Sequence, residues 1–104
     1  MGASYKGHLD VSQILCDSGA DVNAATNRGS TALTAASAEG HLDISRFLYD
    51  SGADVNAATN NGSTALMAAS EGGHLDVSRI LCESGADVNA ADDDGWTALM
   101  WAIH

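Results

Sequence analysis

The sequence Asn-Arg-Gly-Ser-Thr-Ala-Leu at residues 27–33 returns as Asn-Asn-Gly-Ser-Thr-Ala-Leu at residues 60–66 and as Asp-Asp-Gly-Trp-Thr-Ala-Leu at residues 93–99, each time 33 positions further on. A unit copied at such a period cannot bury its apolar face alone, so neighbouring units must stack into an elongated array. We therefore expect function to reside on a surface that several units share, and arrays of this kind usually bind other proteins.

The period divides the chain into one domain over residues 1–104. Residues 26–58 and 59–91 are complete units, whereas residues 1–25 correspond to the last 25 positions of a unit and residues 92–104 to its first 13. This division leaves no residue for a linker, a tail or a second domain.

Within residues 26–58 the local signals predict two short helices after a tight turn. Gly29 supplies the positive φ of the turn, which marks a hairpin tip, and Thr31 offers an N-cap hydroxyl to the first helix. Gly40 is suited to end that helix after about two turns. A second helix with an apolar face follows and ends before Gly52.

Charge limits the classes of partner. The chain carries 14 acidic and four basic side chains, a net charge of −10, which repels phosphate backbones and anionic lipid. No apolar run is long enough to span a membrane, and no secretory signal is visible. We expect no nucleic-acid and no membrane partner, and an intracellular location in the cytoplasm or nucleus.

Recurring polar residues do not build a chemical site. One histidine and one aspartate return in each unit, about 10 Å apart in a stack, so neither set can converge on one metal ion. We expect the histidines to organise the turn between helices and the aspartates to bond the loop backbone. Cys16 and Cys82 fall two units apart and are expected to be free thiols. No catalytic motif is present, so we expect no metal, no cofactor and no enzyme activity. The recurring residues are His8, His41 and His74, and Asp21, Asp54 and Asp87.

Three sequence motifs together indicate a family. Gly-x-Thr-Ala-Leu, Gly-His-Leu-Asp and Leu-x-x-Ser-Gly-Ala-Asp-Val-Asn-Ala recur in order over the whole chain, which closely resembles the ankyrin repeat. The resemblance implies an all-α solenoid in which each 33-residue unit contributes two antiparallel helices and a projecting β-hairpin loop.

The resemblance also implies a binding surface, a concave groove made by the hairpin tips and the exposed face of each first helix. The first two matching positions, Tyr5 and Lys6, align with Ala38 and Glu39 of the next unit. The remaining candidates are Asn27, Arg28, Ser30, Ala38, Glu39, Asn60, Asn61, Ser63, Glu71, Gly72, Asp93, Asp94 and Trp96.

The chain departs from the family in ways that lower its expected stability. The family's Thr-Pro-Leu-His opening is Thr-Ala-Leu followed by Thr or Met here, and the chain has no proline. Ser12, Ser45 and Ser78 stand where the family commonly has a branched apolar residue.

The third hairpin differs from the other two. Its acidic residues at 92–94 either favour a basic partner or act only as a solvated tip. Trp96 replaces a serine and is either an interface anchor or a side chain folded back over Leu99 or the neighbouring hairpin. Trp101 replaces an alanine, and we expect it to pack in the open space beside the terminal unit.

These features give three functional hypotheses. The first is a non-catalytic module that binds a protein, with a basic partner favoured by the acidic tip. The second is head-to-tail self-association through incomplete ends, because the chain begins inside a first helix that precedes a second helix over residues 9–18, and it stops in a first helix over residues 98–103. The third is an engineered minimal repeat protein with no natural partner, which the near-identity of the units allows.

Overall fold

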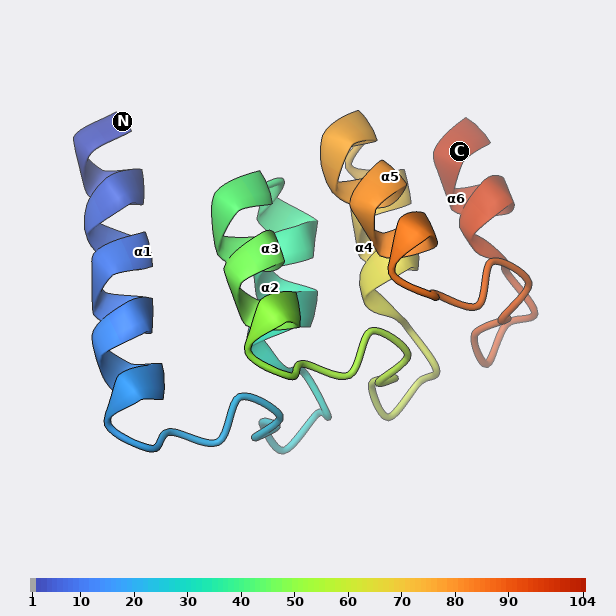
Figure 1. The fold of residues 1–104 in the computed structure, drawn as a ribbon. Helices are drawn as coiled ribbons and strands as arrows, with labels where there is room; N and C mark the ends of the chain where they lie inside the picture. Colours follow the sequence, from blue (N-terminus) through green and yellow to red (C-terminus); the bar gives the residue numbers. More distant parts are fainter. Residues whose placement is uncertain (1) are drawn as a thin grey trace.

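The computed structural model describes residues 2–104, with side chains from residue 8 onward, and the helices in this range stand side by side in two layers (Figure 1). Neighbours pack within each layer, and α2 and α4 also pack on the second helices of their own repeats. The expected all-α repeat architecture is confirmed. One layer holds the first helices α2 (Ala32–Glu39), α4 (Ala65–Glu71) and α6 (Ala98–Ile103), and the other holds α1 (Gly2–Asp17), α3 (Leu42–Asp50) and α5 (Leu75–Glu83).

The hairpins that precede the first helices are tight and short. In the second hairpin the Thr59 N–H donates to the Ser63 carbonyl at 2.8 Å, and the Gly62 N–H donates to the Thr59 carbonyl at 2.9 Å. Gly62 has φ +81°, the left-handed conformation that this turn requires. A single antiparallel bridge joins Ala58 to Thr64. No longer strand forms in the part of the chain that the structure describes, so each β-hairpin is reduced to its tip.

Each first helix begins at a threonine cap, as the sequence predicts. The Thr31 side chain accepts a hydrogen bond from the Thr34 N–H at 3.3 Å, and Thr64 and Thr97 cap α4 and α6 in the same way. Gly40 ends α2 with φ +74°. Such a cap is worth about 1 kcal/mol, which matters for helices of only six to eight residues.

The core lies between the two layers and is centred on the complete repeats. Leu33 and Met67 fill it from the first-helix layer, and Val77 and Leu81 fill it from the second-helix layer, each with at most 2% of its surface exposed. Burial of each such side chain contributes about 1.5–3 kcal/mol. Small residues such as Ala69, which is fully buried, allow the helices of the first layer to approach closely.

Loops after the second helices are cross-linked from repeat to repeat. Within one loop, Asp54 Oδ1 accepts from the Asn56 N–H at 2.9 Å, which confirms the expected bonding of the recurring aspartates. Between loops, Asn23 Oδ1 accepts from the Asp54 N–H at 2.7 Å, and Asn23 Nδ2 donates to the Gly52 carbonyl at 3.1 Å. Asn56 makes the same two bonds to the following loop. One asparagine per repeat therefore fixes the spacing of neighbouring loops.

The N-terminal segment folds differently from the expectation. A first-helix fragment, a turn and a separate second helix over residues 9–18 were expected, but Gly2–Asp17 form one continuous helix. This helix packs on α3, in the second-helix layer. A glycine within a helix costs only about 1 kcal/mol relative to alanine, so Gly7 does not by itself end the helix, and a break there would sacrifice helical hydrogen bonds. The prediction of a separate first helix at the N-terminus is therefore wrong.

His74, at the turn between α4 and α5, links its repeat to the preceding one. His74 Nε2 lies 3.0 Å from the Ala38 carbonyl of the preceding repeat. The His74 ring also covers Gly40 so closely that a Cβ built on that glycine would lie 2.5 Å from His74 Nδ1. The expected role of this histidine in the turn is confirmed, and the contact explains why Gly40 must lack a side chain.

We predict that Gly40→Ala destabilises the protein more than Gly73→Ala does. The two glycines occupy the same place in consecutive repeats and have φ +74° and φ +70°, but a Cβ at Gly73 would meet no atom within 4 Å. Both variants incur the strain of a positive φ, about 1 kcal/mol, and only Gly40→Ala must also displace His74, at a further cost of about 1–2 kcal/mol. Urea unfolding followed by circular dichroism measures the difference, and equal destabilisation by the two variants contradicts the proposed contact.

Candidate functional site

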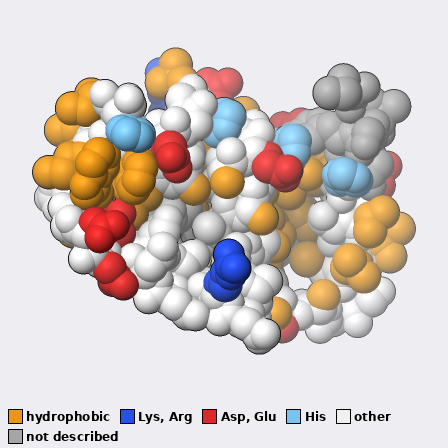
Figure 2. Space-filling view, turned by 180° about the vertical axis from the view of Figure 1, so that it is seen from behind, with side chains coloured by type: hydrophobic (Ala, Val, Ile, Leu, Met, Phe, Trp, Pro, Cys, Tyr) orange, Lys and Arg blue, Asp and Glu red, His pale blue; other side chains and the backbone are white. Residues whose placement is uncertain are grey.

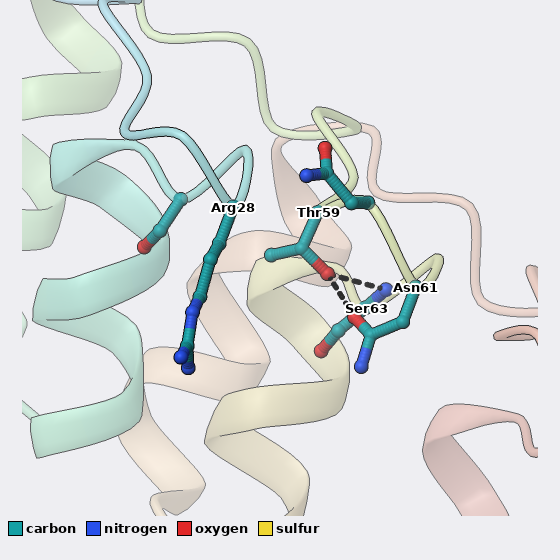
Figure 3. A pocket seen from close by; sticks show the side chains of 6 residues that line it. Arg28, Thr59, Asn61 and Ser63 are labelled. Carbon is teal, nitrogen blue, oxygen red and sulfur yellow. Dashed lines mark hydrogen bonds between the residues drawn. The ribbon is translucent and has the colours of Figure 1, made fainter.

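A depression lined by residues with polar side chains lies between the tips of the first and second hairpins. It has a volume of about 600 Å³ and is open to solvent. The Arg28 side chain enters from the first hairpin and extends toward the first helices, while Asn61 and Ser63 project from the second hairpin beside it (Figure 3). The residues that line it are Arg28, Ser30, Thr59, Asn60, Asn61 and Ser63.

The depression is held together by hydrogen bonds between the hairpins. The Asn60 N–H donates to the Arg28 carbonyl at 2.8 Å, and Asn60 Nδ2 donates to the Asn27 carbonyl, also at 2.8 Å. The Asp93 N–H donates to the Asn61 carbonyl at 3.0 Å, which ties the third hairpin to the second. The three tips therefore form one row whose backbone is fixed. Asn60, predicted as a contact residue, serves here as a structural link.

Five of the predicted contact residues thus gather in the depression, and others lie elsewhere. Ala38, Glu39 and Glu71 are exposed but occupy the last positions of their helices, next to the turn that leads into the second helix. Glu39 Oε2 lies 3.6 Å from His41 Nε2. Residues 5 and 6 belong to α1 in the second-helix layer, and the predicted contacts of Tyr5 and Lys6 fall outside the side chains that the structure describes.

The third hairpin carries an aromatic cluster instead of a polar depression. Trp96 and Trp101 stack with ring centroids 4.7 Å apart and planes tilted by 41°, and His104 meets both rings edge-on. Trp96 is partly buried. Of the two alternatives from the sequence, the side chain folds back, although onto Trp101 and His104 and not onto Leu99. The expected packing of Trp101 is confirmed.

Asp92 anchors this cluster, a role that was not predicted from the sequence. Its Oδ1 accepts from the N–H groups of Trp96 at 2.9 Å and Asp94 at 3.0 Å, and its Oδ2 accepts from the Trp101 indole N–H at 3.1 Å. The other two hairpins have Thr26 and Thr59 at this position. A comparison of the three units could have revealed this role. Asp92 replaces a threonine, and a carboxylate, unlike a hydroxyl, has a second oxygen that can accept a hydrogen bond from the indole.

These hydrogen bonds also change the acidity of Asp92. The N–H of Trp96 contributes most to holding the pKa of the Asp92 carboxyl below its usual range; partial desolvation opposes this, and the Trp101 indole and the Asp94 N–H add to the lowering. Asp92 is therefore charged at neutral pH, next to the exposed carboxylates of Asp93 and Asp94. This end of the hairpin row is strongly negative.

Other kinds of site find no support in the described residues. Among them, no three potential metal ligands come close enough to hold an ion. No helix in the described range is long and apolar enough to cross a membrane. Cys16 and Cys82 are free thiols, as expected.

Comparison with known families decides the classification. A family model described as ankyrin repeats, three copies, matches residues 1–59 and 56–104. The chain belongs to the ankyrin repeat family. Ankyrin repeats are generally protein–protein interaction modules and typically lack catalytic activity. No curated protein matches the chain.

We predict that Asp92→Thr loosens the aromatic cluster but preserves the hairpin. Thr26 and Thr59 show that a threonine hydroxyl accepts the backbone N–H bonds of this turn, whereas it cannot also reach the indole of Trp101. Because the folded pKa of Asp92 is lowered, its stabilising contribution is present above the unfolded value of about 3.9 and is lost as pH falls through the folded value.

The stability difference between the parent chain and Asp92→Thr should therefore be largest near neutral pH and shrink below about pH 4. Urea unfolding at several pH values measures it. A difference that stays constant down to pH 2 contradicts a charged anchor at Asp92.

Proposed function

We propose that this ankyrin domain binds a protein partner through its hairpin row and the adjoining first-helix surface. The observation that carries the proposal is the fixed row of tips, in which backbone hydrogen bonds join Arg28 to Asn60 and Asn61 to Asp93. Because the backbone of these tips is already fixed, binding costs little additional ordering of the loops, so modest contacts suffice for affinity. The depression is lined by one guanidinium, hydroxyls and amides, and no carboxylate, imidazole or thiol lines it, which favours recognition over catalysis.

Electrostatics favours a partner that carries basic groups. The chain has a net charge of −10, and Asp93 and Asp94 are exposed at the end of the hairpin row. A potential of this sign accelerates encounter with cationic surfaces at low salt and weakens as salt is added. The partly buried rings of Trp96 and Trp101 offer aromatic surface next to these carboxylates, as interface hot spots commonly do.

We predict that alanine substitutions at Arg28, Asn61, Asp94 and Trp96 weaken binding to a partner isolated by pull-down with the full chain. At least two of the four should lower affinity tenfold or more, because hot spots concentrate on aromatic and arginine side chains at the centre of an interface. Affinity is measured by calorimetry, and circular dichroism checks that each variant folds.

Matched controls lie on the opposite layer. Arg46→Ala and Arg79→Ala remove exposed charges from α3 and α5 and should leave affinity within about twofold. Unchanged affinity for all four hairpin variants contradicts the assignment of the binding surface.

A second candidate function is head-to-tail association of chains, supported by the exposed hydrophobic side chains that gather at both ends of the molecule, on α1 and α6 (Figure 2). On α6, Leu99 and Ile103 are 71% and 80% exposed, and on α1, Val11 and Ile14 are 54% and 64% exposed. The helix α6 belongs to the first-helix layer and α1 to the second. One copy's α6 and another copy's α1 would therefore combine into a complete repeat. Because α1 is one continuous helix, it brings no first helix of its own that would compete with α6 for that place.

We predict that the 104-residue chain shows a mass that rises with concentration in light scattering, because such a contact either closes a ring or propagates. Ile103→Glu places a charge in the contact and should return the mass to that of a monomer, whereas Val88→Glu, at an exposed apolar loop position, should not. A monomer at every concentration contradicts the association.

A further inference from the structure

Arg28 is an isolated positive charge on the binding surface of an acidic protein. Of the cationic side chains that the structure describes, Arg46 and Arg79 lie on α3 and α5, so Arg28 is the one on the hairpin row. It is exposed, and no carboxylate among the described residues pairs with it. The chain has 14 acidic side chains, and none of those described pairs with this guanidinium. We therefore expect Arg28 to bind an anionic group of a partner.

The depression supplies further donors for such an anion. The hydroxyls of Ser30 and Ser63 line it and are partly buried, and within the described part of the chain neither has a hydrogen-bond partner. A guanidinium offers paired N–H groups whose geometry matches a carboxylate. An Asp or Glu side chain that entered the depression would find the Arg28 guanidinium and two serine hydroxyls among the groups that line it.

The opposite sign prevails at the other end of the row. Asp93 and Asp94 are exposed, and Trp96 and Trp101 lie beside them. Carboxylates next to indole faces favour a guanidinium or ammonium group, through ion pairing and through attraction of a cation to the aromatic face. The hairpin row therefore changes sign from its first tip to its third.

The distance between the two ends fixes the spacing of complementary groups. The first and third hairpins are two repeats apart, about 16–20 Å if each repeat advances by the roughly 8–10 Å spacing between the axes of packed helices. An extended segment rises about 3.3 Å per residue, so about five or six residues span this distance.

We propose that the partner presents an extended segment with an acidic residue at the Arg28 depression and a basic residue, five or six positions away, at the Asp93–Asp94 end. This inference rests on the proposed function and adds the polarity and register of the bound segment. A uniformly basic segment would place a cation against Arg28, where like charges repel. Arg28 thereby rejects partners that overall attraction alone would admit.

Selection from a random twelve-residue peptide display library against the immobilised full chain tests the proposal. Enriched peptides should carry an acidic and a basic residue at the stated spacing, in one direction. Selection against Arg28→Glu should replace the acidic residue with a basic one, and selection against a chain with Asp93→Lys and Asp94→Lys should replace the basic residue with an acidic one. A peptide selected on the parent chain should lose tenfold or more in affinity for Arg28→Glu and regain it when its acidic residue becomes Lys.

The control and the contrary outcomes separate this inference from the proposed function. Arg46→Glu, which changes the net charge equally but lies on α3, should leave the enriched sequences unchanged. Peptides that require Trp96 but show no acidic residue and bind Arg28→Glu normally overturn the polarity and leave the binding surface in place. Peptides indifferent to Arg28, Asn61, Asp94 and Trp96, or the absence of any enrichment, overturn both.

Discussion

Hydrogen bonding between the loops and between the hairpins of consecutive repeats is the constraint on which the rest of the structure depends. In the loops, an asparagine side chain accepts a hydrogen bond from a backbone N–H of the next loop and donates one to a carbonyl of that loop, as Asn23 does with Asp54 and Gly52. At the hairpin level, backbone groups bond directly, as Asn60 does to Arg28. The helices themselves are short, so they gain their stability from neighbours and not from intrinsic propensity. If these hydrogen bonds did not fix the spacing between repeats, the leucines would not pack into a core and the hairpin tips would not align in a row.

Much of this arrangement was predictable from the sequence, because its causes lie within one unit. The threonine caps, the left-handed Gly40 and the bonding of the recurring aspartates depend on residues that are close together in the chain. The hairpin tips likewise follow from a glycine with positive φ, and five predicted contact residues meet in one depression. Periodicity then extends each local result to every copy.

The predictions failed where a unit differs from the other copies. Residues 2–17 form one helix, in which Gly7 does not make the turn that Gly40 makes in the next copy, and alignment of the copies hides this difference. Asp92 was overlooked for a related reason: its second oxygen matters only because Trp101 stands where interior repeats have alanine. Two hydroxyls, those of Ser37 and Ser45, are buried and have no hydrogen-bond partner within the described residues. Such groups reduce stability, and Ser45 is one of the serines that stand where the family commonly has a branched apolar residue.

The aromatic cluster has a consequence for how unfolding of this protein is observed. Both tryptophans of the chain, Trp96 and Trp101, lie within the last hairpin and helix, so tryptophan fluorescence, excited at wavelengths that tyrosine does not absorb, reports on this repeat alone, whereas helical ellipticity averages over every repeat. In a linear array the end units separate most readily from the rest. The difference between the midpoint denaturant concentrations of the two signals therefore measures how tightly the last repeat is coupled to its neighbour. No added label is needed for this measurement.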